Sequence, residues 1–129
     1  MTKLDLATLN TTPSAEEGSW LELEHPVTGE PLDIHIKLAG TDSDHYQKQL
    51  RKQQDKRLKK GFRKTKSEEL ENEGIELLVA CTLEWKNVVH EDQELQCDAA
   101  NVRWLYKNYK WIKEAVDEFV GDRSNFLLE

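Results

Sequence analysis

The side chains that could bind a metal or act as nucleophiles are few and scattered. The four histidines are His25, His35, His45 and His90. None of them belongs to an HExxH pattern or lies beside paired cysteines, and the six glycines are too dispersed for a phosphate-binding loop. Cys81 lies in an apolar run, where burial disfavours the reactive thiolate, and it forms no CxxC pair with Cys97. We therefore expect reduced thiols, no metal site, no cofactor and no enzymatic activity.

The strongest charge feature is a basic run within residues 41–66. This stretch holds ten Lys or Arg and three Asp, a local charge of +7, whereas the whole chain carries −7 and the remainder therefore −14. Such opposite blocks can steer copies of the chain together, so we expect a homo-oligomer. The cations expected to make these electrostatic contacts are Arg51, Lys52, Lys56, Arg57, Lys59, Lys60, Arg63 and Lys64. Nucleic-acid binding by residues 47–66 is the alternative, although no aromatic cluster supplies base stacking and the acidic remainder would repel phosphates.

Aromatic residues are dense in the last thirty residues, which contain no plausible catalytic group. Exposed aromatic side chains next to charged ones are typical of protein interfaces. We take Trp104, Tyr109 and Phe126 as candidate partner-binding residues. Trp85 and Trp111 are expected in the core, because both fall on apolar helical patterns.

The elements that would position these residues predict an α+β domain, a β-hairpin packed on a mainly helical body. Residues 1–18 are polar and predict a flexible N-terminal arm. Over 19–40, apolar residues alternate with polar ones on both sides of a Pro-Val-Thr-Gly turn, which predicts an antiparallel hairpin. A hairpin alone is marginal in water, so its apolar face must pack on helices or on another chain. Together, residues 19–129 predict a single domain.

The remaining chain predicts a basic helix over 41–66 and a helical core over 67–129. The apolar stripe from Leu70 to Val89 predicts one central helix, with Ser67 as its N-cap. Asp98 should cap a short helix, and a last helix should end near Gly121. Asp122 should then cap a final turn that returns Phe126 to the body.

No apolar run has the length of a membrane span, and no signal peptide opens the chain. We therefore expect the protein in the cytoplasm of the cell that makes it, without membrane contact.

Three stretches of the sequence resemble the tail assembly chaperones of long-tailed bacteriophages. The first is Leu38–Tyr46, a hairpin end followed by a Gly-Thr-Asp-Ser segment and an aromatic residue. The second is Leu77–Trp85, and the third is the tail that closes on Phe119–Phe126. Their order and spacing carry the resemblance, which covers about residues 20–46 and 67–127 and leaves 47–66 unaligned.

The resemblance implies a non-enzymatic protein that coats the tape measure protein, keeps its long apolar helices soluble and recruits tail tube subunits. It also implies a protein of the host bacterium's cytoplasm that is absent from the mature virion. The position of the chain end shortly after Phe126 would suit the short, non-frameshifted form of such chaperones. The competing hypothesis is the small nucleic-acid-binding protein that uses the basic helix.

Overall fold

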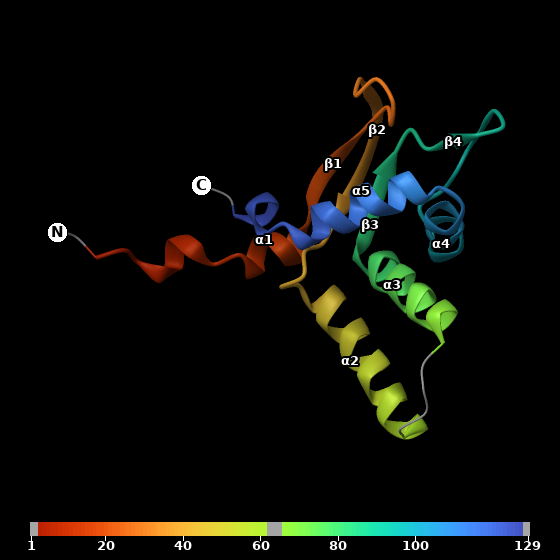
Figure 1. Ribbon diagram of the computed structural model, residues 1–129. Coiled ribbons are helices and arrows are strands. Elements are labelled where there is room, and N and C mark those ends of the chain that lie inside the picture. Colours follow the sequence, from red (N-terminus) through yellow and green to blue (C-terminus); the bar gives the residue numbers. More distant parts are fainter. Residues whose placement is uncertain (1–2, 62–65, 128–129) are drawn as a thin grey trace.

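The computed structural model describes residues 3–61 and 66–127 and has the expected α+β architecture (Figure 1). A three-stranded antiparallel sheet of order β1-β2-β3 is crossed on one face by α5, while α2 and α3 pair and extend away from it. The strands are β1 (Ser19–Glu24), β2 (Pro31–Leu38), β3 (Thr82–Lys86), β4 (Val89–His90) and β5 (Gln93–Glu94). The helices are α1 (Thr12–Glu17), α2 (Asp44–Lys60), α3 (Ser67–Cys81), α4 (Ala99–Asn108) and α5 (Lys110–Gly121), with 3₁₀ turns η1 (Leu6–Leu9) and η2 (Arg123–Phe126).

The predicted hairpin is confirmed. Leu21 pairs with Ile36 on the face that packs on the helices, and Glu22 pairs with His35 on the opposite, solvated face. Gly29 takes a φ of 74° in the connecting turn, a conformation that glycine adopts without steric cost. The alternation of the sequence therefore sets which side chains enter the core.

The central helix is shorter than predicted, because α3 ends at Cys81 and the chain continues directly into β3. The prediction of one helix reaching Val89 was wrong. The Thr82 hydroxyl donates to the Leu78 carbonyl oxygen (2.7 Å), and Trp85 pairs with Ile36 of β2. Thr and Trp are residue types that favour strands. The free edge of β2 supplies the strand with which β3 pairs, and a helical pattern in the sequence does not reveal that distant strand.

The α2–α3 pair is a helical hairpin held by polar contacts. Ser43 caps α2 by accepting from the Tyr46 backbone N–H (3.2 Å). Gln53 is only 8% exposed, and its side-chain amide donates to the Glu73 carbonyl oxygen (2.9 Å). Lys66, and not Ser67, occupies the N-cap position of α3, and its side chain makes no capping hydrogen bond.

The N-terminal segment differs in part from the flexible arm expected over 1–18. Residues Thr12–Glu17 form α1, and Ala15 within it is buried. The Gly40 backbone N–H donates to the Ala15 carbonyl oxygen (3.0 Å), and the Thr11 hydroxyl donates to the Asp42 carboxylate (2.5 Å). These contacts join α1 to the segment that follows the hairpin.

The caps of the C-terminal region agree with the sequence at its two aspartates. Asp98 accepts from the Asn101 N–H (2.8 Å) to start α4, and Asp122 accepts from the Ser124 N–H (3.0 Å) to start η2. α5 ends at Gly121, as predicted, and Asp122 occupies its C-cap position. Within the described part of the chain, no helix has both the length and the apolarity to cross a membrane.

Candidate functional site

A small apolar cavity lies where the β4–β5 ribbon meets the sheet and the junction of α4 and α5. Its volume is about 160 Å³. We call it the aromatic cleft, and its principal lining residues are Val89, His90, Leu95, Trp104, Tyr109 and Trp111. Trp104 and Tyr109 are two of the three residues predicted to bind a partner, so the structure brings these two together.

The aromatic rings of the cleft contact each other edge to face. The Trp104 and Tyr109 ring centroids are 5.7 Å apart at 63°, and the His90 and Trp104 centroids are 4.8 Å apart at 72°. Both geometries are the favourable T-shaped arrangement of aromatic pairs. Val89 beside them is 59% exposed, so apolar surface continues from the cleft to the solvent.

Local hydrogen bonds fix the positions of these rings. The Asn108 side chain donates to the Trp104 carbonyl oxygen (2.8 Å) at the end of α4, and Tyr109 is the single residue between α4 and α5. Asn108 is the last residue of α4. On the opposite wall, the Trp85 indole N–H donates to the Leu95 carbonyl oxygen (2.8 Å) and holds the ribbon against the sheet.

The sequence patterns did not predict the β4–β5 ribbon that carries His90. Glu91 and Asp92 both have positive φ, 50° and 64°, as in the two-residue turns that match strand twist. The pair lacks the glycine that usually marks such a turn. The only available signal was the spacing of exactly two residues between Val89–His90 and Gln93–Glu94.

Phe126, the third predicted partner-binding residue, lies in the core and not on the surface. It is 1% exposed and stacks edge to face on Phe119, with centroids 5.7 Å apart. A Cβ atom at Gly40 would lie only 2.9 Å from the Phe126 ring. The capped turn η2 returns the ring to the body as predicted, so the Phe126 side chain offers almost no exposed surface to a partner.

The cations predicted for electrostatic contacts are partly paired within the chain. Arg57 bonds to Glu73, and Lys60 Nζ lies 3.6 Å from Glu69 Oε2, so α3 neutralises part of α2. The outer face of α2 retains basic side chains exposed to solvent, including Arg51, Lys52, Lys56 and Lys59. Arg63 and Lys64 lie outside the described residues.

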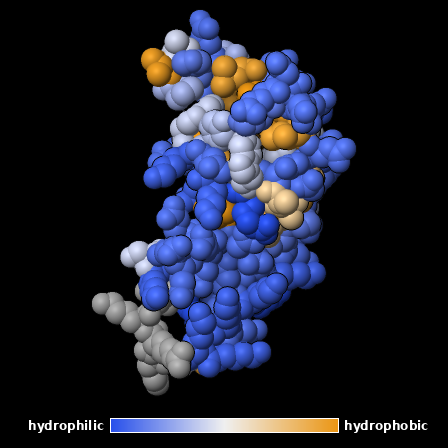
Figure 2. All heavy atoms as spheres, turned by 90° about the vertical axis from the view of Figure 1, so that its right-hand side faces the viewer, coloured by the Kyte–Doolittle hydropathy of each residue, from blue (hydrophilic) through white to orange (hydrophobic). Residues whose placement is uncertain are grey.

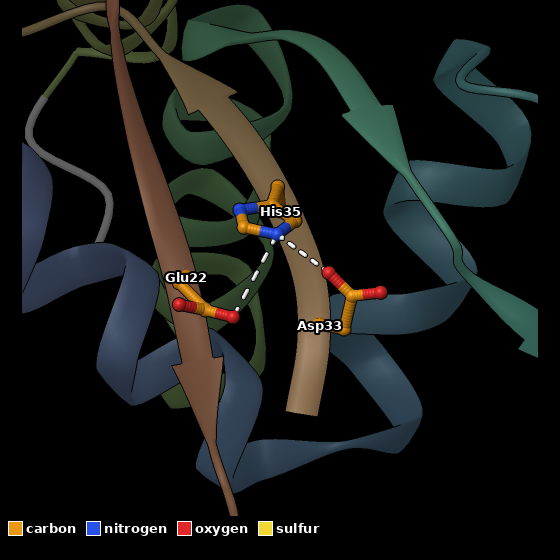
Figure 3. A group of neighbouring side chains, drawn as sticks. All are labelled: Glu22, Asp33 and His35. Carbon is orange, nitrogen blue, oxygen red and sulfur yellow. Dashed lines mark hydrogen bonds and ion pairs between the residues drawn. The ribbon is translucent and has the colours of Figure 1, made fainter. Parts of the chain in front are cut away.

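Among the residues that the structure describes, one group of possible metal ligands forms, on the solvated face of the sheet (Figure 3). His35 Nε2 lies 3.1 Å from Asp33 Oδ1 and 3.7 Å from Glu22 Oε2. The cross-strand register of the hairpin brings Glu22 to His35, a proximity that spacing along one strand does not reveal. The Asp33 side chain is 84% exposed, and the contact between the His35 ring and the Asp33 carboxylate is a hydrogen bond at the protein surface.

Neither thiol is suited to nucleophilic chemistry at neutral pH. Burial raises the pKa of Cys81 to about 12, and burial together with the nearby Asp98 carboxylate raises the pKa of Cys97 to about 11. Both groups therefore remain protonated thiols near pH 7.

Comparison of the chain with protein-family models, with curated proteins and with solved structures finds no match.

Proposed function

We propose that this protein is a non-enzymatic tail assembly chaperone of a long-tailed bacteriophage. In this proposal it binds apolar helices of the tape measure protein, helps to recruit tail tube subunits, and acts in the cytoplasm of the host bacterium. The observation that carries the proposal is the meeting of Trp104 and Tyr109 in one open apolar cleft. Aromatic side chains in a partly desolvated pocket are the usual anchors of protein interfaces.

The distribution of surface polarity supports a protein partner at this end of the molecule. Figure 2 shows small, separated hydrophobic patches among hydrophilic residues in the upper half of the face toward the viewer, on the side where Figure 1 places β4 and α4. The lower half, toward α2 and α3, is hydrophilic. An amphipathic helix laid over the upper region would cover Val89 and present an apolar side chain to the cleft.

Co-expression with the tape measure protein of the same phage tests the proposal. The wild-type chain should keep that protein soluble, and Trp104→Ala should weaken the complex by about 2 kcal/mol, about thirtyfold in Kd. Trp20→Ala is the matched control, because Trp20 is 39% exposed on the solvated sheet face, where Lys86 Nζ lies over its ring. Circular dichroism must show that both variants are folded. Equal loss of solubilisation in the two variants would contradict a role for the aromatic cleft.

Nucleic-acid binding remains the second candidate because the outer face of α2 is basic. Lys48, Arg51, Lys52, Lys56 and Lys59 surround a shallow depression there with one acid, Asp55. If this surface binds nucleic acid, affinity should fall steeply with salt, and Arg51→Gln with Lys56→Gln should abolish binding. Salt-sensitive DNA binding without any effect on tape measure solubility would favour this function over the chaperone.

A further inference from the structure

A second groove runs between β1 and α5. Its volume is about 510 Å³. Residues 21–24 of β1 form one wall, and α5 forms the other. The helix contributes the partly buried side chains of Trp111, Ala115 and Phe119 to an apolar floor, which Leu21 of β1 completes. The groove is therefore a slot between an edge strand and a helix.

The β1 side of this slot offers unpaired backbone groups. β1 lies at the edge of the sheet and pairs only with β2. In the described part of the chain, no backbone group of Ser19–Glu24 makes a hydrogen bond outside that pairing. A row of free N–H and C=O groups is a template for another strand.

The rim of the groove is acidic. Glu22 and Glu24 extend from β1, Glu118 extends from α5, and Asp122 follows directly after that helix. No Lys or Arg is found among the described residues that line the groove. An occupant with basic side chains would therefore be attracted, and one with acidic side chains repelled.

We infer that the groove between β1 and α5 binds an extended, basic segment of a partner protein by strand addition to β1. Side chains of an added strand alternate between its two faces. One set therefore lies on Leu21, Ala115 and Phe119, and the other projects beside Glu22 and Glu24. The preferred ligand alternates apolar and basic residues, and β1 is long enough to pair with about six of them.

This inference goes beyond the proposed function, because it concerns a different surface and a different ligand. The aromatic cleft receives a helix, whereas this groove receives a strand. Leu23 and Trp111 line both, so the test uses residues that line only the groove.

The probe is an end-capped peptide of about eight residues that alternates lysine and valine, labelled for fluorescence anisotropy. We expect saturable binding to the full chain that weakens with salt. In hydrogen exchange, bound peptide should slow exchange in Ser19–Glu24. A peptide of the same sequence, N-methylated at alternate residues on the pairing edge, keeps the charge but loses the hydrogen bonds, and should bind at least about tenfold more weakly.

Variants of α5 locate the site. Glu118→Lys should weaken binding about fivefold, whereas Glu114→Lys, an exposed charge reversal on the same helix outside the groove, should leave the Kd unchanged. Equal affinity for the N-methylated peptide, or equal effects of the two variants, would overturn the proposal. So would the absence of binding to the unmodified peptide. Tape measure solubilisation by Glu118→Lys should remain as in wild type, which separates this site from the aromatic cleft.

Discussion

The junction of α3 and β3 is held by a buried hydroxyl pair whose energetic coupling can be measured. Tyr106 is 0% exposed, and its hydroxyl lies 2.7 Å from the Thr82 Oγ1 atom. Thr82 donates its own proton to the Leu78 carbonyl oxygen, so Tyr106 is the donor to Thr82. The two hydroxyls therefore form a chain that ends at the last turn of α3.

The two single substitutions should have unequal costs. Tyr106→Phe removes one hydrogen bond and should lower the free energy of unfolding by about 0.5–1.5 kcal/mol. Thr82→Val keeps the side-chain shape but leaves the buried Tyr106 hydroxyl without an acceptor, which should cost about 1–3 kcal/mol. The double variant has no orphaned hydroxyl at this position. It should therefore be more stable than the sum of the single effects predicts, by about 1 kcal/mol.

Urea unfolding of the four proteins, with the m-value checked for constancy, measures this coupling. A difference of about 1 kcal/mol corresponds to about 4 °C in Tm for a chain of this size. Additive effects within about 0.3 kcal/mol would refute the reasoning, because they would mean that water already satisfies the Tyr106 hydroxyl.

Five further outcomes are expected. Gly40→Ala should destabilise the fold by about 1–3 kcal/mol in urea, because the new Cβ would lie 2.9 Å from Phe126, whereas Gly74→Ala, with open space around it, should stabilise α3 by about 0.5–1 kcal/mol. Arg123 donates to both Asp42 oxygens (2.8 and 2.9 Å) and with Thr11 lowers the Asp42 pKa from 3.8 to about 2. The stability deficit of Arg123→Gln should therefore be present above pH 4 and disappear as pH falls through about 2. Burial raises the Cys81 pKa from 9.0 to about 12, so unfolding free energies should fall as pH rises above 9, with a shallower slope in Cys81→Ala. Self-association driven by the opposite charge blocks should appear in light scattering at low salt and decrease at high salt; a strict monomer at low salt would contradict it.

The sequence was informative where a local pattern and its environment agree. The alternation of apolar and polar residues in β2 predicted the hairpin. Asp98 and Asp122 predicted two helix starts, because their side chains accept from backbone N–H groups three and two positions later, respectively. These features depend on short-range geometry, which the order of residue types expresses directly.

The failures occurred where a distant segment decided the outcome. The apolar residues Leu78, Cys81 and Trp85 fit one helix face. Trp85 nevertheless lies in a strand, because it pairs with the free edge of β2. Phe126 had the composition of an interface residue, but its burial depends on Gly40 and Ala15, more than eighty residues earlier. The aromatic cleft was found only in part, because the β4–β5 turn lacks its usual glycine.

The base of the α2–α3 hairpin has a consequence for evolution. The Ala39 N–H donates to the Cys81 carbonyl oxygen (2.8 Å), so the two chain ends that enter and leave the hairpin are fastened together beside the sheet. A segment whose first and last residues are adjacent in space behaves as an insertion in the domain. Changes in its length or in its charged residues then cost little loop-closure entropy. The far end of this arm, with the cations that set its charge, can therefore diverge between related chains while the sheet, the aromatic cleft and the β1 edge keep their geometry.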